Sequence, residues 1–492
     1  MNFISTRGGE KVSIARATVK GLAADGGLFV PEKFPTVSRA ELEGMLETDY
    51  PERAAEILMK YFDDFDKGEL LEECKKAYSK FGGDPAPLVR LDDGIYMLEL
   101  WHGQSCAYQD IPLAIFPYLL RKSCDTCGVK EQILLALATS GDTGKAALES
   151  FKDVDGVKVL AVYPAEGVSK MQKLQLTIQD GDNLNVIALR GTFDDCQRAV
   201  KDMFENADFS EELKKRNTVL STVNSINFAR LAPQIAYYFS AYLDLVSGGQ
   251  IEMGEEIDFT VPAGNFGNVI AAYYAKQMGL PVRRLHCASN LNNVITDFLA
   301  TGVYDANREV IKTTSPSMDI AVASDVERLI FEISGRDFAL TAERMKALKS
   351  NLKYEITAAE LLEMQKTFDG GCASEETSVE AMYDVFIDVG YTMDTNTGCA
   401  MKVAQDWYEK NKKDQTNMVI VSPDNPYTFP QDVLYAVTGN DVKDSFKGVK
   451  RLHAATAMAV PKCISALRDK PARFTKSMDA KKLIAEVLSF IN

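Results

Sequence analysis

The stretch TVPAGNFGNVIAAYYAK places a glycine-bearing loop between an apolar strand, which ends near Ala263, and a helix that begins near Asn268. Gly264 and Gly267 let the backbone approach a ligand closely, and the first turn of a helix offers unpaired N–H groups and a positive dipole end. The pattern therefore predicts a phosphate site. A tight strand-to-helix turn without a ligand is the alternative interpretation.

A second loop, ATSGDTGKAAL, has the same strand-loop-helix setting and carries the hydroxyl groups of Ser140 and Thr143. Burial of Asp142 would be costly without hydrogen bonds, so we expect its carboxylate to face a ligand or the helix N-terminus. Open α/β sheets bind ligands at the carboxyl ends of their strands. The two loops together therefore predict one ligand crevice.

A third polar cluster, in STVNSINFARLAPQIAYYF, places Asn224, Ser225, Asn227 and Arg230 just before an apolar helix. Arg230 is the best candidate to bind a carboxylate or phosphate, since its planar guanidinium suits two parallel hydrogen bonds. The alternative is a polar helix start that is capped by Asn or Ser. These residues alone indicate an enzyme or a binding protein for a small phosphorylated ligand.

Apolar runs of four to eight residues, each followed by a glycine-bearing turn and an amphipathic helix, predict the elements that carry these loops. ILLALAT, VKVLAVYP and LNVIALRG form one series, and a second begins with IDFTVPA and VRRLHCAS. This repeated strand-turn-helix pattern predicts an α/β fold with two open, mostly parallel sheets and helical crossovers. We expect a small, mostly helical N-terminal unit (1–95), a first α/β lobe (96–250), and a second lobe (251–492) with the phosphate loop and C-terminal helices.

The composition is that of a globular protein, because 46% of the 492 residues are hydrophobic and 25% are charged. The formal charge of −15 repels nucleic acid and anionic membrane surfaces, although a local positive pocket remains compatible with it. No apolar run approaches the roughly 20 residues that span a bilayer, and no secretory signal is recognised. We expect neither nucleic acid nor membrane as a partner, and a cytoplasmic location.

The nine cysteines are scattered, which favours reduced thiols over a disulfide framework. The tight pair Cys124 and Cys127 would need a second pair or nearby histidines to bind zinc, and the chain has three histidines. We interpret the pair as two thiols in a loop after a helix, and we predict no metal site.

The ordered set of motifs resembles the threonine synthase family, whose pyridoxal-phosphate fold (fold type II) also includes tryptophan synthase β. The resemblance extends along nearly the whole chain and includes FISTRG, GLAADGGLFVP, ATSGDTGKAAL, GVSKMQKLQL, GTFDDCQ, NSINFARLAPQIAYY, VPAGNFGNVIAAYYAKQMGLP, NNVITDF, SPSMDI and VPKCISAL. It implies the cofactor pyridoxal 5'-phosphate and the conversion of O-phosphohomoserine and water to threonine and phosphate.

The resemblance also implies residue roles. The cofactor phosphate would be held by Gly264, Asn265, Phe266, Gly267 and Asn268. Asp142 would lie beside the cofactor, and the substrate would be bound near Ser140, Thr143, Asn224 and Arg230. The implied ligand is a small phosphorylated molecule related to an amino acid, and the resemblance leaves the oligomeric state open.

The stretch WHGQSCAYQD departs from the family pattern, which is close to His-Gly-Pro-Thr-x-Ala-Phe-Lys-Asp. Gln109 stands where the family has the lysine that forms the Schiff base, while His102 and Asp110 are kept. A carboxamide nitrogen cannot form an aldimine. The lost lysine would anchor the cofactor and shuttle protons, and a general base is typically worth ~10²–10⁴ in rate.

Two further departures surround the expected cofactor ring. DTNTG, Asp394 to Gly398, stands where the family usually has Asp-Pro-His-Thr-Ala. SPDNP stands where a Ser-Thr-Ala-Ser-Pro pattern supplies a hydroxyl partner for the pyridine nitrogen, so that Pro423 replaces the threonine. Proline offers neither a hydroxyl nor an N–H group. Ser422 and Asn425 are the neighbouring residues that could substitute.

Another lysine could in principle replace the missing amine. Lys122 lies 13 positions after Gln109, about 20 Å along a helix at 1.5 Å per residue. Lys145 is nearer the crevice, but we expect a lysine at a helix start to point to solvent.

Three hypotheses follow. The first is a working threonine synthase with an atypical site. The second is a catalytically silent relative that binds pyridoxal phosphate or a phosphorylated metabolite noncovalently, and the third is a different reaction that needs no aldimine. The loss of the lysine favours the second hypothesis.

Overall fold

The first large sheet of the molecule is fully parallel and has five strands. The computed structural model describes residues 1–9, 11–166 and 168–491. The strand order is β16-β8-β7-β6-β9. The strands are β6 (Gln132–Ala138), β7 (Val157–Pro164), β8 (Leu184–Leu189), β9 (Thr218–Ser221) and β16 (Ser477–Met478). Continuous apolar runs such as ILLALA suit strands that are buried on both faces.

The second large sheet has six strands in the order β14-β11-β10-β15-β5-β4. Only the edge pair β4 and β5 is antiparallel, and the other pairs are parallel. The strands are β4 (Leu88–Asp92), β5 (Ile95–Glu99), β10 (Ile257–Pro262), β11 (Val282–Ser289), β14 (Phe368–Cys372) and β15 (Met418–Ser422). The expected class, an α/β fold with two open and mostly parallel sheets, is confirmed.

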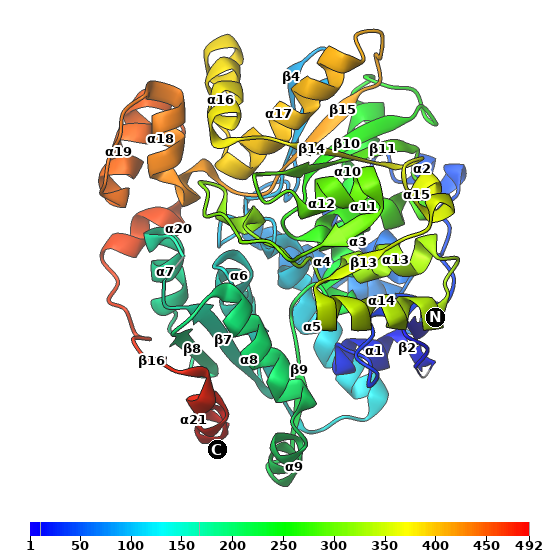
Figure 1. Cartoon of the computed structure of the whole chain (residues 1–492), viewed down its shortest axis with the longest axis vertical. Coiled ribbons are helices and arrows are strands. Elements are labelled where there is room, and N and C mark those ends of the chain that lie inside the picture. Colours follow the sequence, from blue (N-terminus) through cyan, green and yellow to red (C-terminus); the bar gives the residue numbers. More distant parts are fainter. Residues whose placement is uncertain (10, 167, 492) are drawn as a thin grey trace.

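Helices cover both faces of the six-stranded sheet (Figure 1). On one face α17 (Thr395–Lys410) packs against β10, β11 and β15, and on the other α11 (Phe266–Gln277) packs against β10 and β11. Behind α11 lies α10 (Phe228–Ser247), which is apolar around most of its circumference and is buried along nearly its whole length. Such a helix forms the centre of a large core.

The N-terminal segment packs onto this core through α10 and α5 (Asp110–Cys127). It contains a small antiparallel sheet of β1 (Asn2–Ser5), β2 (Val12–Ser13) and β3 (Phe29–Pro31). Its helices are α1 (Ile14–Lys20), α2 (Arg39–Gly44), α3 (Tyr50–Met59) and α4 (Lys67–Tyr78). The segment is thus mostly helical, with a sheet that the sequence pattern does not reveal.

The C-terminal segment runs from the second lobe back to the first (Figure 1). Helices α18 (Pro430–Thr438) and α19 (Ser445–Thr456) lie beside α16 (Glu375–Val389), whereas β16 and α21 (Leu483–Phe490) complete the five-stranded sheet and its core. The domain boundaries at 95 and 250 stay a prediction. In the described part of the chain, no helix has both the length and the apolar character that crossing a membrane requires.

The remaining elements connect or cover these layers. They are α6 (Asp142–Phe151), α7 (Lys170–Thr177), α8 (Phe193–Glu205), α9 (Ala207–Lys215), α12 (Val294–Thr301), β12 (Val303–Asp305), α13 (Val326–Ile333), α14 (Phe338–Asn351), β13 (Lys353–Glu355), α15 (Ala358–Met364) and α20 (Lys462–Ser465). Cys124 and Cys127 are free thiols in the last turn of α5, so their expected place in a loop is wrong.

Candidate active site

Loops that follow strands of both sheets meet at one crevice. The loop after β5 is fastened to the loop after β15, because Tyr108 N donates to Pro423 O (2.7 Å) and Asn425 N donates to Cys106 O (3.0 Å). All of these loops leave the carboxyl ends of strands, where α/β sheets bind ligands. The hydrogen bond from Ser317 Oγ to Asp142 Oδ2 joins the start of α6, after β6 of the other sheet, to the segment beside the GNFGN loop, and one shared ligand crevice stays a prediction.

Gln109 is the N-cap residue of α5, and its side chain makes no capping hydrogen bond. The residue is 5% exposed, and its Oε1 atom has no hydrogen-bond partner within the described residues. A buried acceptor without a partner is costly. The carboxamide therefore has capacity left for a ligand or for water, but it offers no amine.

Asp110 and His102, which the family pattern shares, shape the loop before α5. Ser105 N donates to Asp110 Oδ2 (2.8 Å), and the Asp110 side chain packs so closely on Gly103 that a Cβ atom there would lie 2.3 Å from Asp110 Cβ. Burial raises the pKa of Asp110 to about 6, although the hydrogen bonds from Ser105 oppose the rise. The His102 ring lies 2.8 Å from Glu99 Oε2.

Asp142 is buried at the start of α6 and is fully engaged. Gln172 Nε2 donates to its Oδ1 atom (2.9 Å), and Ser317 Oγ donates to its Oδ2 atom (2.8 Å). Burial alone would raise its pKa, but the nearby ammonium of Lys145 and these donors outweigh burial and lower the pKa. The described partners of the Asp142 carboxylate are thus the side chains of Gln172, Ser317 and Lys145, and its expected position facing a ligand stays a prediction.

Lys145 does not point to solvent, so the sequence-based expectation for it is wrong. Its side chain is 1% exposed, and its Nζ atom lies 3.0 Å from Asp142 Oδ1. Side chains on a helix lean toward its N-terminus, and Lys145 lies one turn inside α6, so its amine is directed back to the crevice. Burial lowers the pKa of Lys145, but the carboxylates of Asp142 and Asp424 outweigh burial and raise it.

The GNFGN loop forms the start of α11 as predicted, with Asn265 as its N-cap. Asn265 Oδ1 accepts from Gly267 N (3.1 Å), whereas the N–H groups of Gly264 and Asn265 have no acceptor within the described residues. Phe266 N is the first N–H group of the helix and has no partner inside it. Three successive donors at the positive end of a helix form a cradle for a phosphate.

The side-chain amides of Asn265 and Asn268 in this loop accept hydrogen bonds from neighbouring helices and loops of the protein. Asn268 Oδ1 accepts hydrogen bonds from the hydroxyl groups of Tyr237 (2.5 Å) and Tyr238 (2.6 Å). Asn265 Oδ1 also accepts from Ser225 Oγ (3.2 Å). These side chains therefore fix the shape of the loop, and its backbone N–H groups are the ones free to hold an anion.

Arg230 lies in the first turn of α10, which begins at Phe228 after the N-cap residue Asn227. The sequence pattern placed Arg230 just before this helix. The residue is fully buried, and none of its three guanidinium nitrogens completes a hydrogen bond with a described residue. The guanidinium lies 5.7 Å from the centre of the Tyr108 ring. A buried unpaired cation is expensive, so this position indicates an anionic ligand.

The other predicted substrate residues lie around the start of α6. Asn224 Nδ2 is 3.5 Å from the carbonyl oxygen of Ala138, the last residue of β6, which brings the Asn224 cluster to the Ser140 loop. Ser140 and Thr143 are half-buried in that loop. Asn224 thus lies beside the end of β6, and Ser140 and Thr143 flank Asp142 in the sequence, while their joint role in substrate binding stays a prediction.

The residues near Pro423 are committed to other contacts. Ser422 Oγ accepts from Thr397 Oγ1 (3.0 Å) and Asn425 Oδ1 accepts from Tyr427 N (3.0 Å), so both side chains hold the local structure. Asp424 accepts from Asn396 Nδ2 (3.0 Å) through Oδ2, while its Oδ1 atom has no partner within the described residues. Burial, followed by the neighbouring Asp142 and Asp394, raises the pKa of Asp424.

Twelve of the 23 buried polar side-chain atoms without hydrogen-bond partners in the described part of the chain belong to the crevice loops and the helices beside them. Besides the three guanidinium nitrogens of Arg230, the described residues contribute Ser105 Oγ, Tyr108 OH, Gln109 Oε1, Lys145 Nζ, Gln175 Oε1, Thr395 Oγ1, Asn396 Oδ1, Asp424 Oδ1 and Thr428 Oγ1. For Lys145 the ion pair with Asp142 is close, but it does not complete a well-directed hydrogen bond. Such a concentration is expected where a polar ligand belongs.

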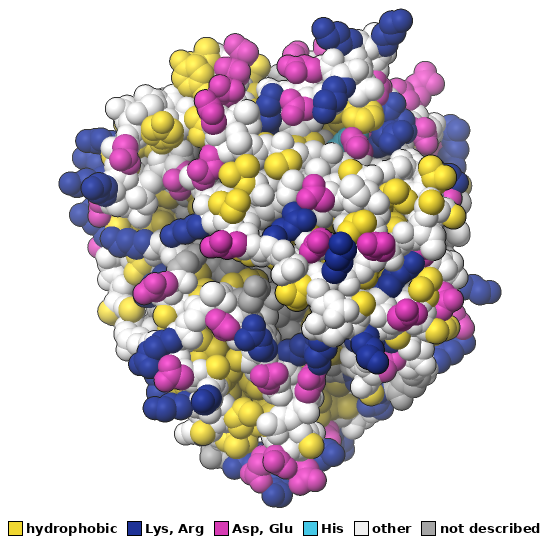
Figure 2. Space-filling view, in the orientation of Figure 1, with side chains coloured by type: hydrophobic (Ala, Val, Ile, Leu, Met, Phe, Trp, Pro, Cys, Tyr) yellow, Lys and Arg dark blue, Asp and Glu magenta, His cyan; other side chains and the backbone are white. Residues whose placement is uncertain are grey.

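The charges of the crevice differ from those of the surface. On the face drawn in Figure 2, acidic and basic side chains are intermixed, and the chain as a whole carries −15. The crevice holds the buried cations Arg230 and Lys145 opposite buried carboxylates. The crevice therefore combines both signs of buried charge, with Arg230 and Lys145 as its cations.

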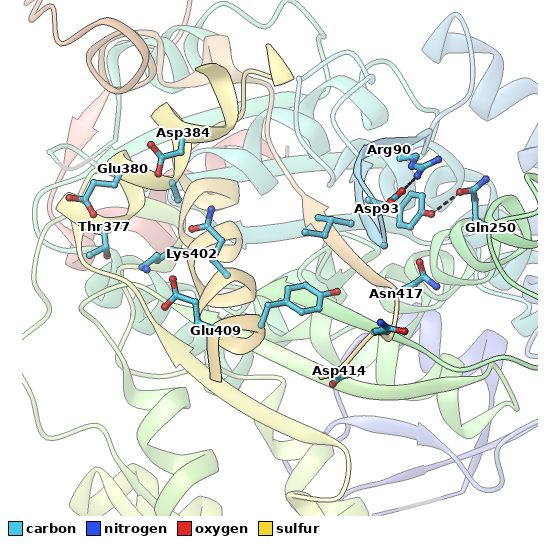
Figure 3. Close-up of a pocket in the computed structure, with 17 residues that line it drawn as sticks. Arg90, Asp93, Gln250, Thr377, Glu380, Asp384, Lys402, Glu409, Asp414 and Asn417 are labelled. Atoms are coloured by element: carbon cyan, nitrogen blue, oxygen red, sulfur yellow. Dashed lines mark hydrogen bonds and ion pairs between the residues drawn. The ribbon is translucent and has the colours of Figure 1, made fainter. Parts of the chain in front are cut away.

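A separate surface pocket lies away from the crevice loops, between the β4–β5 edge of the six-stranded sheet and helices α16 and α17 (Figure 3). Its labelled side chains include Arg90, Glu380, Lys402 and Asp414. Its lining shares no residue with the crevice loops. Within the described residues, no cluster of three or more His, Cys, Asp or Glu side chains could hold a metal ion.

Comparisons with known proteins place this architecture in a family. A family model described as "Threonine synthase N terminus" matches residues 2–78. Threonine synthase from Pseudomonas aeruginosa is 35% identical over 445 residues, which cover 89% of this chain and 91% of that protein. Threonine synthase-like 1 from Homo sapiens is 36% identical over 473 residues, covering 90% of this chain and 62% of that protein. The chain thus spans about three fifths of the human relative.

A solved structure extends the similarity to three dimensions. The crystal structure of pyridoxal-phosphate-bound threonine synthase from Brucella melitensis matches with a TM-score of 0.87 and 31% identity, and covers 100% of both chains. The two sheets and the crevice between them define a protein of the pyridoxal-phosphate fold type II class. The chain belongs to the threonine synthase family.

The sequence prediction missed Asp424 and gave Lys145 the wrong orientation. Asp424 attracted no attention because it stands in a loop whose family pattern has no carboxylate at that position. The Lys145 side chain was expected in solvent because lysine is charged and stands near the start of a helix. The flanking residues Gly144, Ala146 and Ala147 are all buried, and a lysine inside such a small and apolar stretch was the available signal.

Proposed function

We propose that this protein binds pyridoxal phosphate, or a similar small phosphorylated molecule, in the crevice, and that it does not sustain threonine synthase turnover through residue 109. The concentration of buried, unpartnered polar atoms around an intact phosphate cradle carries this proposal. Pyridoxal phosphate supplies an electron sink when bound. The N–H groups of Gly264, Asn265 and Phe266 would hold its phosphate, and Asp142 would lie beside it.

The chain's own residues also favour a second, anionic ligand of the amino-acid type. Arg230 offers a guanidinium without a hydrogen-bond partner within the described residues, and Asn224, Ser140 and Thr143 would offer amide and hydroxyl groups from the neighbouring loops. A planar cation and neutral donors suit a phosphate or carboxylate. A phosphorylated amino acid such as O-phosphohomoserine is the ligand class that this arrangement supports.

Two separate measurements test the proposal. Equilibrium dialysis with pyridoxine 5'-phosphate, which has a hydroxymethyl group in place of the aldehyde, measures the phosphate cradle without any covalent chemistry. We expect saturable binding at one site per chain. Release of threonine and phosphate from O-phosphohomoserine measures turnover, which we expect to be at background.

The outcomes distinguish the hypotheses. No binding of pyridoxine 5'-phosphate would show that the cradle no longer serves this cofactor class. Turnover at a rate typical of an enzyme, roughly 1–10³ s⁻¹, would instead favour a working threonine synthase with an atypical site. The burial of Lys145 is the observation that keeps this second function under consideration.

A further inference from the structure

The crevice contains one amine although Gln109 supplies none. Of the lysines that the structure describes, Lys145 alone is buried, whereas Lys122 pairs with Glu69 and is 30% exposed. A carbonyl compound forms a C=N bond with a primary amine, and lysine is the side chain that provides one. The buried primary amine of Lys145 is therefore a group that can form such a bond with a carbonyl ligand in the crevice.

The position of Lys145 links the two halves of the crevice. Its Nζ atom lies 3.0 Å from Asp142 Oδ1, and the other oxygen of Asp142 accepts from Ser317 Oγ (2.8 Å). The Ser317 carbonyl oxygen packs on the phosphate loop, where it would lie 2.2 Å from a Cβ atom at Gly264. Three successive contacts thus connect the amine to the predicted phosphate site.

Lys145 also interacts electrostatically with groups in the loops that carry Gln109 and Pro423. The Asp424 carboxylate and the Cys106 thiol are close enough to act on the charge of Lys145, and Lys145 in turn acts on Asp110. Asp424 is bridged to Ala107, two residues before Gln109. The amine is thus linked by contacts to the phosphate loop and by charge interactions to the loops around position 109.

We propose that Lys145 is the residue that bonds covalently to pyridoxal phosphate in this protein, in place of the family's lysine at position 109. The inference rests on the proposed function, since it requires that the cradle binds this cofactor. It goes beyond that function by making the binding covalent and by assigning a catalytic residue to a position outside the WHGQSCAYQD stretch.

The bond formation balances without a further reactant. The Lys145 nitrogen adds to the aldehyde carbon, the carbon–oxygen bond breaks, and the oxygen leaves as water with two hydrogens from the ammonium. The third hydrogen remains on the nitrogen of the new C=N bond, so the positive charge beside Asp142 is conserved. Asp142 is placed to take up the proton that must leave the nitrogen while it attacks.

Two other roles for Lys145 predict different chemistry. As a structural partner of Asp142, or as a fixed cation for an anionic ligand, it would need only its charge, and arginine would largely replace it. Arginine cannot form the bond to the aldehyde, because its guanidinium stays protonated. The substitution Lys145→Arg therefore separates covalent attachment from both alternatives.

The experiment uses the full chain incubated with pyridoxal phosphate, reduced with borohydride, digested and mapped by mass spectrometry. We expect near-visible absorption before reduction and a pyridoxyl group on the peptide that contains Lys145. Labelling of that peptide should fall at least tenfold in Lys145→Arg, and it should be unchanged in the matched control Lys122→Arg. Retained binding of pyridoxine 5'-phosphate and an unchanged circular dichroism spectrum would show that the variants are folded.

Each outcome has one meaning. A pyridoxyl group on a different lysine, or no covalent adduct in a protein that binds pyridoxine 5'-phosphate, overturns the inference and leaves the proposed function standing. Failure to bind pyridoxine 5'-phosphate overturns the proposed function, and with it the inference. The unsubstituted protein gives this answer by itself, so the result does not depend on the folding of a variant.

Discussion

Gln109 ends the loop before α5 as a buried carboxamide with an unsatisfied oxygen. Around it, Pro423 has no N–H group to donate, and Ser422 and Asn425 are engaged elsewhere. An amine introduced at position 109 would therefore enter a site in which these neighbours already have partners. Geometry that is wrong by about 1 Å can cost a rate factor of 10².

Restoring the family residue tests how far the site has changed. We expect Gln109→Lys to raise threonine release from O-phosphohomoserine by no more than about tenfold, far below the ~10²–10⁴ that a positioned base supplies. Gln109→Met, of similar size and without an amine, is the matched control. Full family-like activity from the single change would show that the rest of the site is intact.

Arg230 offers a test in which stability and binding move in opposite directions. Replacing an unpaired buried charge with an apolar side chain of similar length should stabilise the ligand-free fold, because the desolvation penalty disappears. We expect Arg230→Met to raise the thermal midpoint while weakening O-phosphohomoserine binding by about 10- to 100-fold, as for a lost charged hydrogen bond. Calorimetry measures both, and a lower midpoint together with unchanged affinity would contradict the assignment.

At the scale of elements, the turn from β10 to α11 depends on close backbone packing. A Cβ atom at Gly264 would lie 2.2 Å from the carbonyl oxygen of Ser317 and 2.9 Å from Met318 Cα. We expect Gly264→Ala to displace the 315–319 segment, to weaken pyridoxine 5'-phosphate binding at least tenfold, and to lower the thermal midpoint. Gly44→Ala is the matched control, since no described atom lies within 4 Å of a Cβ atom there.

Strand-loop-helix units were predictable because their signals are local. ILLALAT, VKVLAVYP, LNVIALRG, IDFTVPA and VRRLHCAS all form the expected strands, and the loops at 140 and 264 stand at their carboxyl ends. Pairings between distant segments were not predictable. The joining of β5 to β15, and of the two-residue β16 to β8, leaves no periodic trace in the sequence.

The candidate site was predictable to the same extent. Glycines, hydroxyl groups and Arg230 indicate a ligand by their residue types and spacing. The structure places them at or just before the starts of α6, α10 and α11. The orientation of Lys145 depends on how α6 packs, which its polarity does not reveal. The engagement of Ser422 by Thr397 likewise depends on contacts between β15 and α17.

For the molecule as a whole, buried carboxyl groups determine the response to pH. Burial is the largest cause that raises the pKa of Asp110, Asp394 and Asp432 to about 6, and that of Glu332 to about 7. A carboxyl group whose pKa is higher in the folded than in the unfolded state stabilises the fold at low pH, and this stability is lost as pH rises through the folded value. In contrast, the Lys60 ammonium is the main cause that lowers the pKa of Glu41 to about 2, so its contribution is lost in acid.

We therefore expect the thermal midpoint to rise by about 2–5 °C as pH falls from 8 to about 5, and to fall again below about pH 4. Differential scanning calorimetry across this range measures it. Asp432→Asn, which removes one of these groups outside the crevice, should flatten the rise. A midpoint that is highest at pH 8 would contradict the assigned direction of these pKa shifts.

The five-stranded sheet takes its fifth strand from residues 477–478, and Met478, Leu483, Val487 and Ile491 fill its outer core beside α8. During synthesis the residues of β6 to β9 leave the ribosome more than 250 residues before this segment. The edge of β8 is thus left without its partner for most of translation, and an open strand edge invites pairing with other chains. Nascent chains of this protein should accordingly depend on a chaperone until the segment emerges.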